Sequence, residues 1–293
     1  MIEPTHTGAV VRKIRLSLII AKLPLCFLVA FSSMFGHIFA QQSIDLQSLQ
    51  IFLAVFFLAC GGASFNSYQE RHEDRLMKRT QDRPLAMEEI TNRHAVVQAL
   101  LLISLGLLGI FTVSNLKAFV AGVCGIALYN LVYTRMKSWS FHAIVPGAVC
   151  GAIPPYIGWL AADGAPVSSG AALVVLLLIF WQIPHFFLVM LNHRIDYSQS
   201  ISPNMLKYLE EPALQRIFMP WITALAATMI TFSTISSPLG IIERFLVVGN
   251  AIVLLVVFSC YLFFTKTPNY KVLFHLLNTS LFLFMLTICY SFF

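Results

Sequence analysis

Long apolar stretches separated by short polar segments make up most of this 293-residue chain. A helix that crosses the hydrocarbon of a bilayer needs about 20 mostly apolar residues. Nine stretches meet that requirement, and they cover residues 17–40, 49–70, 94–114, 117–135, 142–161, 169–192, 216–236, 241–264 and 272–292. The pattern predicts an all-α, polytopic membrane protein, with about nine transmembrane helices forming a bundle in the lipid bilayer.

The composition supports a single integral-membrane domain over residues 1–293. Hydrophobic residues make up 58% of the chain and charged residues only 11%, whereas soluble domains carry about 25% charged residues. A soluble enzyme is therefore excluded. The net charge of +6 does not indicate nucleic-acid binding, because the cations lie in short segments between apolar stretches rather than clustered on one solvated face.

The distribution of cations along the chain predicts the orientation in the membrane. With nine alternating spans, two cations (Lys117 and Arg244) fall on one side and Lys22 falls within the first stretch. The other side holds sixteen of the 19 cations: Arg12, Lys13, Arg15, Arg71, Arg75, Lys78, Arg79, Arg83, Arg93, Arg135, Lys137, Arg194, Lys207, Arg216, Lys266 and Lys271. Cytoplasmic segments of membrane proteins carry the excess of Lys and Arg. We therefore expect a cytoplasmic N-terminus and a C-terminus outside.

Residues 1–16 are expected to form a short cytoplasmic leader before the first span. Cations followed by an apolar run resemble a signal peptide, but Lys22 and Pro24 interrupt the run early, and it is too long and shows no small-residue cleavage site. The leader contains Glu3 and is not rich in Arg or Ser, so nothing indicates a transit peptide. We expect a retained helix in a bacterial inner membrane.

Two predicted cytoplasmic loops, at residues 67–93 and 193–215, are unusually long and acidic. Together they hold nine of the 13 acidic residues of the chain. Long loops are commonly solvated and mixed in charge, which is the simplest explanation. The other loops of this chain are almost free of acids, however, so we interpret these two as candidate active-site loops.

The first acidic loop carries oxygen ligands at helical spacing. Asn66, Glu70 and Asp74 follow an i, i+4, i+8 pattern, so on a helix that continues out of the second span they share one face. Mg²⁺ takes carboxylate and amide oxygens but keeps several waters and shares its coordination with phosphate. This row of side chains therefore predicts a Mg²⁺ site at the membrane rim.

Cations follow directly after this row. Lys78, Arg79 and Arg83 lie within one or two turns of Asp74, and Arg side chains match phosphate oxygens in pairs. Acidic side chains that can bind a metal ion lie next to cationic side chains that can bind an anion. This combination predicts a site for a metal ion and a diphosphate. The alternative is a helix end with ordinary i, i+4 ion pairs, in which Asn66 would have no part.

The second acidic loop repeats the spacing. Asn192, Asp196 and Ser200 again follow an i, i+4, i+8 pattern at the end of the sixth span, with Arg194 and Tyr197 close by. The two host helices are four spans apart and should run in the same direction. The repetition predicts a duplicated four-helix unit with two facing polar ends.

These residues resemble a known family. The pattern N-x-x-x-(D/E)-x-x-x-D followed by M-x-R-T-x-x-R-P-L resembles the signature of the UbiA superfamily of intramembrane prenyltransferases. Tyr133-Thr-Arg-Met-Lys137 points the same way, and Tyr270-Lys-Val-Leu-Phe-His275 resembles the entry to the family's last helix. The branch with a haem acceptor is favoured by Gly151-Ala-Ile-Pro-Pro-Tyr-Ile-Gly-Trp159 and Trp181-Gln-Ile-Pro-His-Phe186. The chain departs from that branch at Glu70, where Asp is usual, and at Ala21-Lys22-Leu23-Pro24, where T-K-P-R is usual.

The resemblance implies farnesyl diphosphate and haem B as substrates, with Mg²⁺ as the cofactor and terminal oxidase assembly factors as conceivable partners. It implies Mg²⁺ ligands at Asn66, Glu70, Asp74 and Asp196, the last being the only carboxylate of its motif. Catalytic roles in handling the diphosphate fall to Asn66, Asp74, Lys78, Arg79 and Arg83. Substrate contacts are implied for Tyr129, Asn130, Tyr133, Lys137, His185, Arg194 and Tyr197.

The sequence leaves alternative interpretations of these residues and of the function open. His185 could contact haem or be a hydrogen-bonded packing residue, and Tyr129, Asn130 and Tyr133 could equally be core residues. The acceptor could be an aromatic acid or quinone precursor instead of haem. A third hypothesis is that the protein is a secondary transporter. Transporters place their ionisable residues near the bilayer midplane, whereas the ionisable residues of this chain lie mainly at the cytoplasmic rim.

Overall fold

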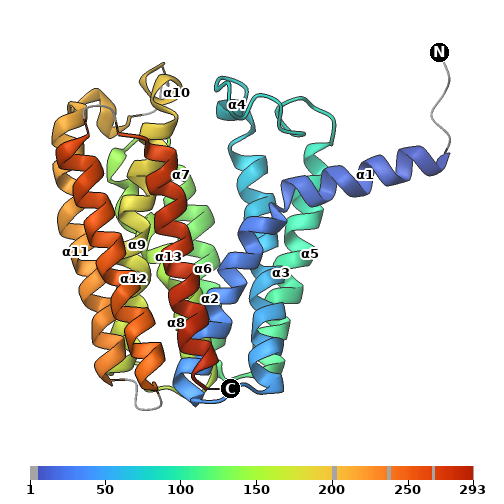
Figure 1. The fold of residues 1–293 in the computed structure, drawn as a ribbon. Coiled ribbons are helices and arrows are strands. Elements are labelled where there is room, and N and C mark those ends of the chain that lie inside the picture. The colour runs from blue at the N-terminus through green and yellow to red at the C-terminus, as the bar shows by residue number, and fades with distance from the viewer. Residues whose placement is uncertain (1–5, 200–202, 236–238, 266–267, 293) are drawn as a thin grey trace.

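The computed structural model describes residues 6–199, 203–235, 239–265 and 268–292, and nine helices within them are long and apolar enough to cross a membrane (Figure 1). The prediction of a nine-helix integral membrane protein is confirmed for this part of the chain. The spans are α2 (Leu23–Gln41), α3 (Leu46–Gln69), α5 (Asn92–Val113), α6 (Leu116–Ala127) with η1 (Leu128–Tyr133) and α7 (Thr134–Met136), η2 (Phe141–Ala143) with α8 (Ile144–Ala161), α9 (Ser169–Asn192), α11 (Glu211–Ile235), α12 (Ile241–Ser259) with η4 (Cys260–Phe264), and α13 (Tyr270–Tyr290).

The beginning of the chain differs from the prediction. A single first span at residues 17–40 is wrong, because α1 (His6–Ile20) and α2 are separate helices with Lys22 between them in the left-handed conformation, at φ 53°. Pro24 lacks the N–H that would bond to the carbonyl of Ile20, so a continuous helix loses a hydrogen bond at this point. Much of the predicted leader is therefore helical, and α1 projects away from the bundle (Figure 1).

Polar residues begin several of the long helices. Their side chains accept hydrogen bonds from the first free N–H groups of the helix, which have no partner within the helix itself. At α3 the bonding is reciprocal, since Ser48 N donates to Asp45 and Asp45 N donates to Ser48 Oγ. The other capping residues are Thr91 for α5, Asn115 for α6, Ser168 for α9 and Asn269 for α13.

Glycine allows α2 and α8 to pack with their backbones in contact. A Cβ atom on Gly158 would overlap the carbonyl oxygen of Ser33, and one on Gly36 would overlap the carbonyl oxygen of Pro155. Close approach at small residues is how helices associate in lipid, where burying apolar side chains gains little. This contact joins the first span to the middle of the bundle.

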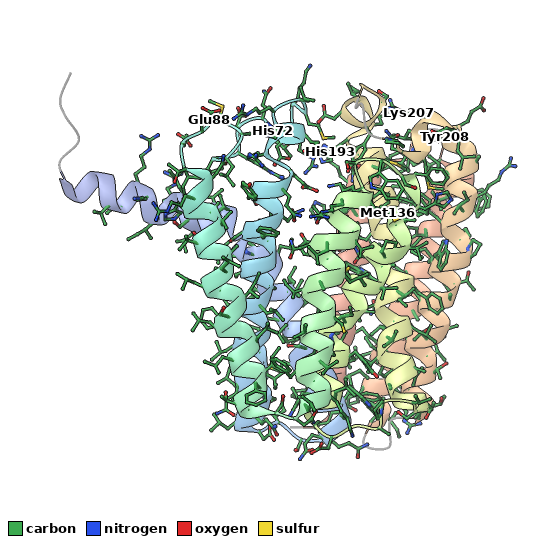
Figure 2. All side chains as sticks on the ribbon, turned by 180° about the vertical axis from the view of Figure 1, so that it is seen from behind. His72, Glu88, Met136, His193, Lys207 and Tyr208 are labelled. Atoms are coloured by element: carbon green, nitrogen blue, oxygen red, sulfur yellow. The ribbon has the colours of Figure 1, made fainter. Side chains whose placement is uncertain are left out.

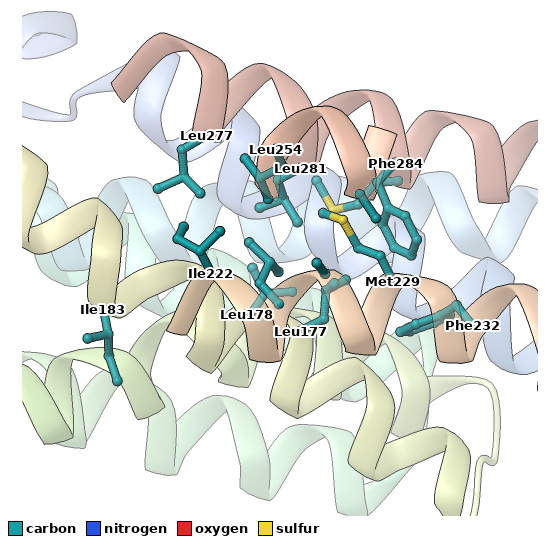
Figure 3. Close-up of a cluster of buried hydrophobic side chains, with 14 of the residues drawn as sticks. Leu177, Leu178, Ile183, Ile222, Met229, Phe232, Leu254, Leu277, Leu281 and Phe284 are labelled. Carbon is teal, nitrogen blue, oxygen red and sulfur yellow. The ribbon is translucent and has the colours of Figure 1, made fainter. Parts of the chain in front are cut away.

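The largest buried apolar cluster lies among α9, α11, α12 and α13 and extends to α2 and α8 (Figure 3). Many large apolar side chains elsewhere on the spans are exposed, as expected for helices that face lipid rather than water. The cluster includes Leu177, Leu178, Ile222, Met229, Phe232, Leu254, Leu277, Leu281 and Phe284.

The two long loops lie at the same end of the bundle. The first contains α4 (Arg71–Asp74), and the second contains α10 (Arg194–Gln199) and η3 (Met205–Lys207). His72 and Glu88 of the first loop and His193 and Lys207 of the second appear at this end in Figure 2. Both α3 and α9 end here (Figure 1), so they run in the same direction as predicted, whereas the four-helix duplication stays a prediction.

Candidate active site

The predicted row of oxygen ligands continues from α3 into α4. Glu70 follows the last residue of α3, yet Glu70 N still donates to Asn66 O at 2.9 Å and Asp74 N to Glu70 O at 2.8 Å. The i, i+4, i+8 relation therefore persists across the junction. Asn66 and Asp74 are buried, with 3% and 6% of their surfaces exposed.

Each member of the row has a cationic partner. Lys22 Nζ donates to Asn66 Oδ1 at 2.8 Å, and Lys137 Nζ donates to Glu70 Oε1 at 3.0 Å. Arg83 Nη1 donates to both carboxylate oxygens of Asp74, at 2.8 Å each. The two carboxylates are thus paired with cations from the end of α7 and from the first loop, and the amide of Asn66 is paired with the cation at the α1–α2 junction.

These pairings set the charge states at the rim. Burial raises the pKa of Glu70, but the ammonium groups of Lys137 and Lys22 outweigh it and bring the pKa to about 2. Burial lowers the pKa of Lys137, but the Glu70 carboxylate outweighs burial and raises it. Burial and the charge of Arg83 lower the pKa of Lys22 to about 8. Glu70 and Lys137 are therefore both charged at neutral pH.

A pocket opens between the two loops beside this row. Its walls combine acids, cations and a few aromatic side chains, so it can hold an anion next to carboxylates. The lining residues are Glu70, Glu73, Asp74, Met77, Arg79 and Arg83 from the first loop, Thr134, Lys137, Ser138, Ser140, Phe141 and Ala143 from the α7–α8 segment, and Phe186, Tyr197, Pro203, Asn204 and Met205 from α9 and the second loop.

The predicted motif of the second loop makes contacts within the protein. Asp196 Oδ2 accepts a hydrogen bond from the backbone N–H of Arg79 at 3.3 Å, which ties the two loops together. Asn192 Nδ2 donates to Tyr270 O at 3.3 Å, so this amide faces α13. Ser200, the third member of the predicted motif, lies outside the described residues, as does Lys266 of the cation count.

The donor set of the first loop suits Mg²⁺. Among the residues that the structure describes, no three His, Cys, Asp or Glu side chains come together closely enough to hold a metal by themselves. Mg²⁺ does not require such a cage, since it binds through one or two carboxylates together with waters and phosphate oxygens. Asn66, Glu70 and Asp74 supply hard oxygen atoms of this kind, with Asp196 on the opposite loop.

Three residues that were predicted to contact substrate make contacts with other parts of the protein. Tyr129 and Tyr133 stack on each other in η1, with ring centroids 5.8 Å apart. Asn130 Nδ2 donates to Gly62 O at 3.1 Å and to Gln69 Oε1 at 3.2 Å, so it joins η1 to α3. These three residues lie beside the ligand row, and contact with a substrate stays a prediction for them.

The remaining predicted residues lie at the surface or deeper in the bundle. Lys78 is exposed on the first loop, and Arg194 is exposed at the beginning of α10. His185 is in α9, where its Nδ1 lies 3.0 Å from Asn278 Oδ1.

Two residues at the site were not predicted. Lys22 appeared in the sequence analysis as an interruption of the first span and as part of Ala21-Lys22-Leu23-Pro24, with no role assigned, yet it reaches Asn66. Thr134 Oγ1 accepts a hydrogen bond from Asn66 Nδ2 at 3.2 Å and donates to Tyr129 O at 2.9 Å. A lone lysine in an apolar run, at the lysine position of the usual T-K-P-R pattern, is a signal that could have identified Lys22.

The chain is similar in sequence to a known family of prenyltransferases. Residues 25–291 match the UbiA prenyltransferase family, and the chain belongs to that family. The chain is 32% identical over 203 residues to the protoheme IX farnesyltransferase of Nitratidesulfovibrio vulgaris (strain DP4), covering 69% of this chain and 71% of the relative. It is 31% identical over 221 residues to the protoheme IX farnesyltransferase of Geobacter sulfurreducens, covering 74% and 80%.

Solved structures show the same fold. The structure of a UbiA homolog from Archaeoglobus fulgidus bound to GPP and Mg²⁺ is similar with a TM-score of 0.70 at 16% identity, covering 94% of this chain and 99% of the other. A structure of digeranylgeranylglyceryl phosphate synthase gives a TM-score of 0.74 at 17% identity, covering 96% and 99%. At such identities the similarity establishes the fold.

Proposed function

We propose that this chain is a protoheme IX farnesyltransferase, which joins the farnesyl group of farnesyl diphosphate to a vinyl group of haem B with net addition of water. Its relatives in Nitratidesulfovibrio and Geobacter carry that name. The observation that carries the proposal is the pocket at the end of the bundle, where the Glu70–Lys137 and Asp74–Arg83 pairs face residues of the second loop.

The diphosphate is bound by the charges of this pocket. Arg79, Arg83 and Lys137 line it and neutralise the phosphate oxygens, while Asn66, Glu70 and Asp74 would hold Mg²⁺. When bound, Mg²⁺ stabilises negative charge on the departing diphosphate. The cations of the chain do the same from fixed positions, which lowers the barrier where charge develops.

The apolar bundle suits the rest of the reaction. When the C–O bond of farnesyl diphosphate breaks, its electron pair leaves with the diphosphate and an allylic cation remains. One vinyl carbon of haem forms the new C–C bond, the other takes a hydroxyl from water, and a proton is released. Apolar walls such as Phe186 and Met205 at the pocket limit premature capture of the cation by water.

The proposal also includes the membrane in which the protein lies and its partners. The excess of sixteen Lys and Arg residues on one side of the spans supports a cytoplasmic position for the two loops, and the protein would lie in a bacterial inner membrane. Both substrates can then approach from the bilayer, since each carries a large apolar part. The product is a haem that a terminal oxidase could receive, so oxidase assembly factors are the expected partners.

Purified protein tests the proposal directly. Protein in lipid nanodiscs is incubated with farnesyl diphosphate, haem B and Mg²⁺, with and without a chelator, and extracted haem is analysed by mass spectrometry. We expect a haem heavier by one farnesyl group and one water, formed only without the chelator. Absence of this product, with prenylation of an added aromatic acid instead, would establish the alternative acceptor.

A further inference from the structure

A hydrogen-bonded chain between α9 and α13 fixes how His185 carries its proton. Asn278 Nδ2 donates to the carbonyl oxygen of Phe274 at 2.7 Å, and Asn278 Oδ1 lies 3.0 Å from His185 Nδ1. A carbonyl only accepts, so the amide nitrogen of Asn278 must face Phe274 and its oxygen must face the imidazole. That oxygen also only accepts, so His185 Nδ1 carries a proton. In the neutral ring the lone pair is then on Nε2.

Two aromatic rings hold the imidazole in place. The ring of His185 lies 4.5 Å from that of Trp181, one turn earlier in α9, and 5.0 Å from that of Phe274 in α13. The side chain is partly exposed, and Nε2 has no hydrogen-bond partner among the described residues. The ring is therefore oriented by its neighbours while its lone pair is left without a partner.

The position of His185 is close to the pocket. It lies seven residues before the end of α9, which corresponds to a depth of about 10 Å below the loops, and the next residue, Phe186, lines the pocket. An imidazole at this depth can bind a molecule that lies in the apolar part of the bundle.

We propose that Nε2 of His185 is an axial ligand of the iron of the haem acceptor, and that Asn278 is the positioning residue that holds the imidazole for this purpose. The inference rests on the proposed function, because it takes haem as the acceptor. Histidines that bind metals almost always donate their other ring N–H to an oxygen atom, which fixes the tautomer and the ring direction, and histidine is a common axial ligand of haem iron. Iron ligation fixes the macrocycle while its vinyl group reacts.

Haem titrations without farnesyl diphosphate test the ligand. Wild-type protein in nanodiscs is titrated with haem B, and the reduced complex is studied by absorption and resonance Raman spectroscopy. We expect an iron–histidine stretching band in the wild type, its loss in His185→Ala, and its return when imidazole is added to that variant. His275→Ala is the matched control, because His275 is exposed on α13 and should leave the band unchanged.

The positioning role of Asn278 is tested by a second variant. Asn278→Leu should keep the iron–histidine band at lower frequency, since the imidazole loses its acceptor, and should raise the Kd for haem by about 10–100-fold. A residue that only joins two helices would change stability and leave the frequency unchanged. An unchanged frequency and Kd in Asn278→Leu would therefore overturn the positioning role.

The outcomes separate this inference from the proposed function. A wild type that binds haem without an iron–histidine band, or a His185→Ala variant that keeps the band, overturns the ligand assignment even if the wild type forms farnesylated haem. A wild type that forms no farnesylated haem overturns the proposed function, whatever the spectrum. If His185→Ala does not fold, the Asn278→Leu variant decides the ligand, because only a histidine that is hydrogen-bonded to Asn278 would show a shifted iron–histidine band.

Discussion

Arg83 donates through a single guanidinium nitrogen to both carboxylate oxygens of Asp74, at 2.8 Å each. Both residues belong to the first loop, and both line the pocket. The carboxylate is almost entirely buried, with 8% of its side chain exposed, whereas 29% of the Arg83 side chain is exposed. The pair therefore places one acid and one cation, already oriented by each other, at the wall that would face the diphosphate.

Asp74→Asn should reduce kcat/KM for prenyl transfer by about 100-fold or more, the size of effect expected when a preorganised charge is removed from a transition state. The amide keeps the shape of the side chain but loses the charge that binds Mg²⁺ and orients Arg83. Product formation under saturating haem measures the effect. Asp82→Asn, on an exposed residue of the same loop, is the control and should keep wild-type activity.

Lys137→Met should lower both stability and activity. Glu70 would then be a buried carboxylate without its 3.0 Å partner. Breaking a fully buried pair costs about 3–5 kcal/mol, and we expect about 2 kcal/mol here because Lys137 is 35% exposed. The thermal unfolding midpoint of the protein in detergent gives the stability.

The double variant separates the two effects of this pair. Lys137→Met with Glu70→Gln removes both charges, so it should recover most of the lost stability without recovering prenyl transfer. Recovered activity would mean that the pair is structural and that neither charge handles diphosphate or metal.

Asn66→Ala should raise the Mg²⁺ concentration needed for half-maximal activity. The variant loses one oxygen of the proposed ligand row but keeps both carboxylates, so excess Mg²⁺ should restore part of the rate. A titration of activity with Mg²⁺ after chelator treatment gives the requirement. Gln81→Ala, an exposed amide on the first loop, should show the wild-type curve, and an equal curve for Asn66→Ala would remove Asn66 from the ligand set.

The sequence predicted the parts of this molecule that depend on local spacing. Nine apolar stretches were sufficient to place the spans, and the spacing of Asn66, Glu70 and Asp74 was sufficient to place them on one face. Both rest on helical periodicity, which a single sequence displays directly. The break at Lys22 was missed because Pro24 was interpreted as an interruption within one span rather than as a helix boundary.

Contacts between distant segments could not be predicted. Lys22 reaches Asn66 across 44 residues, Thr134 reaches it across 68, and His185 meets Asn278 across 93. Such pairs depend on how whole helices pack, and no spacing rule within one helix encodes them. Asp196 shows the same limit, because its spacing within the second loop does not indicate that its Oδ2 accepts a hydrogen bond from the backbone N–H of Arg79; its role as a Mg²⁺ ligand stays a prediction.

The contact between α2 and α8 gives a stability test that does not involve the pocket. Gly158→Ala should destabilise the protein by more than the 1–3 kcal/mol or so typical of overpacking, because the added Cβ would overlap the carbonyl oxygen of Ser33, a backbone atom that cannot move aside. Gly249→Ala is the matched control, since no atom lies within 4 Å of the Cβ it would add and removing a glycine from the interior of α12 should be neutral or slightly stabilising. Thermal midpoints of the two variants measure the difference. Equal midpoints would mean that α2 and α8 do not approach each other through these backbones.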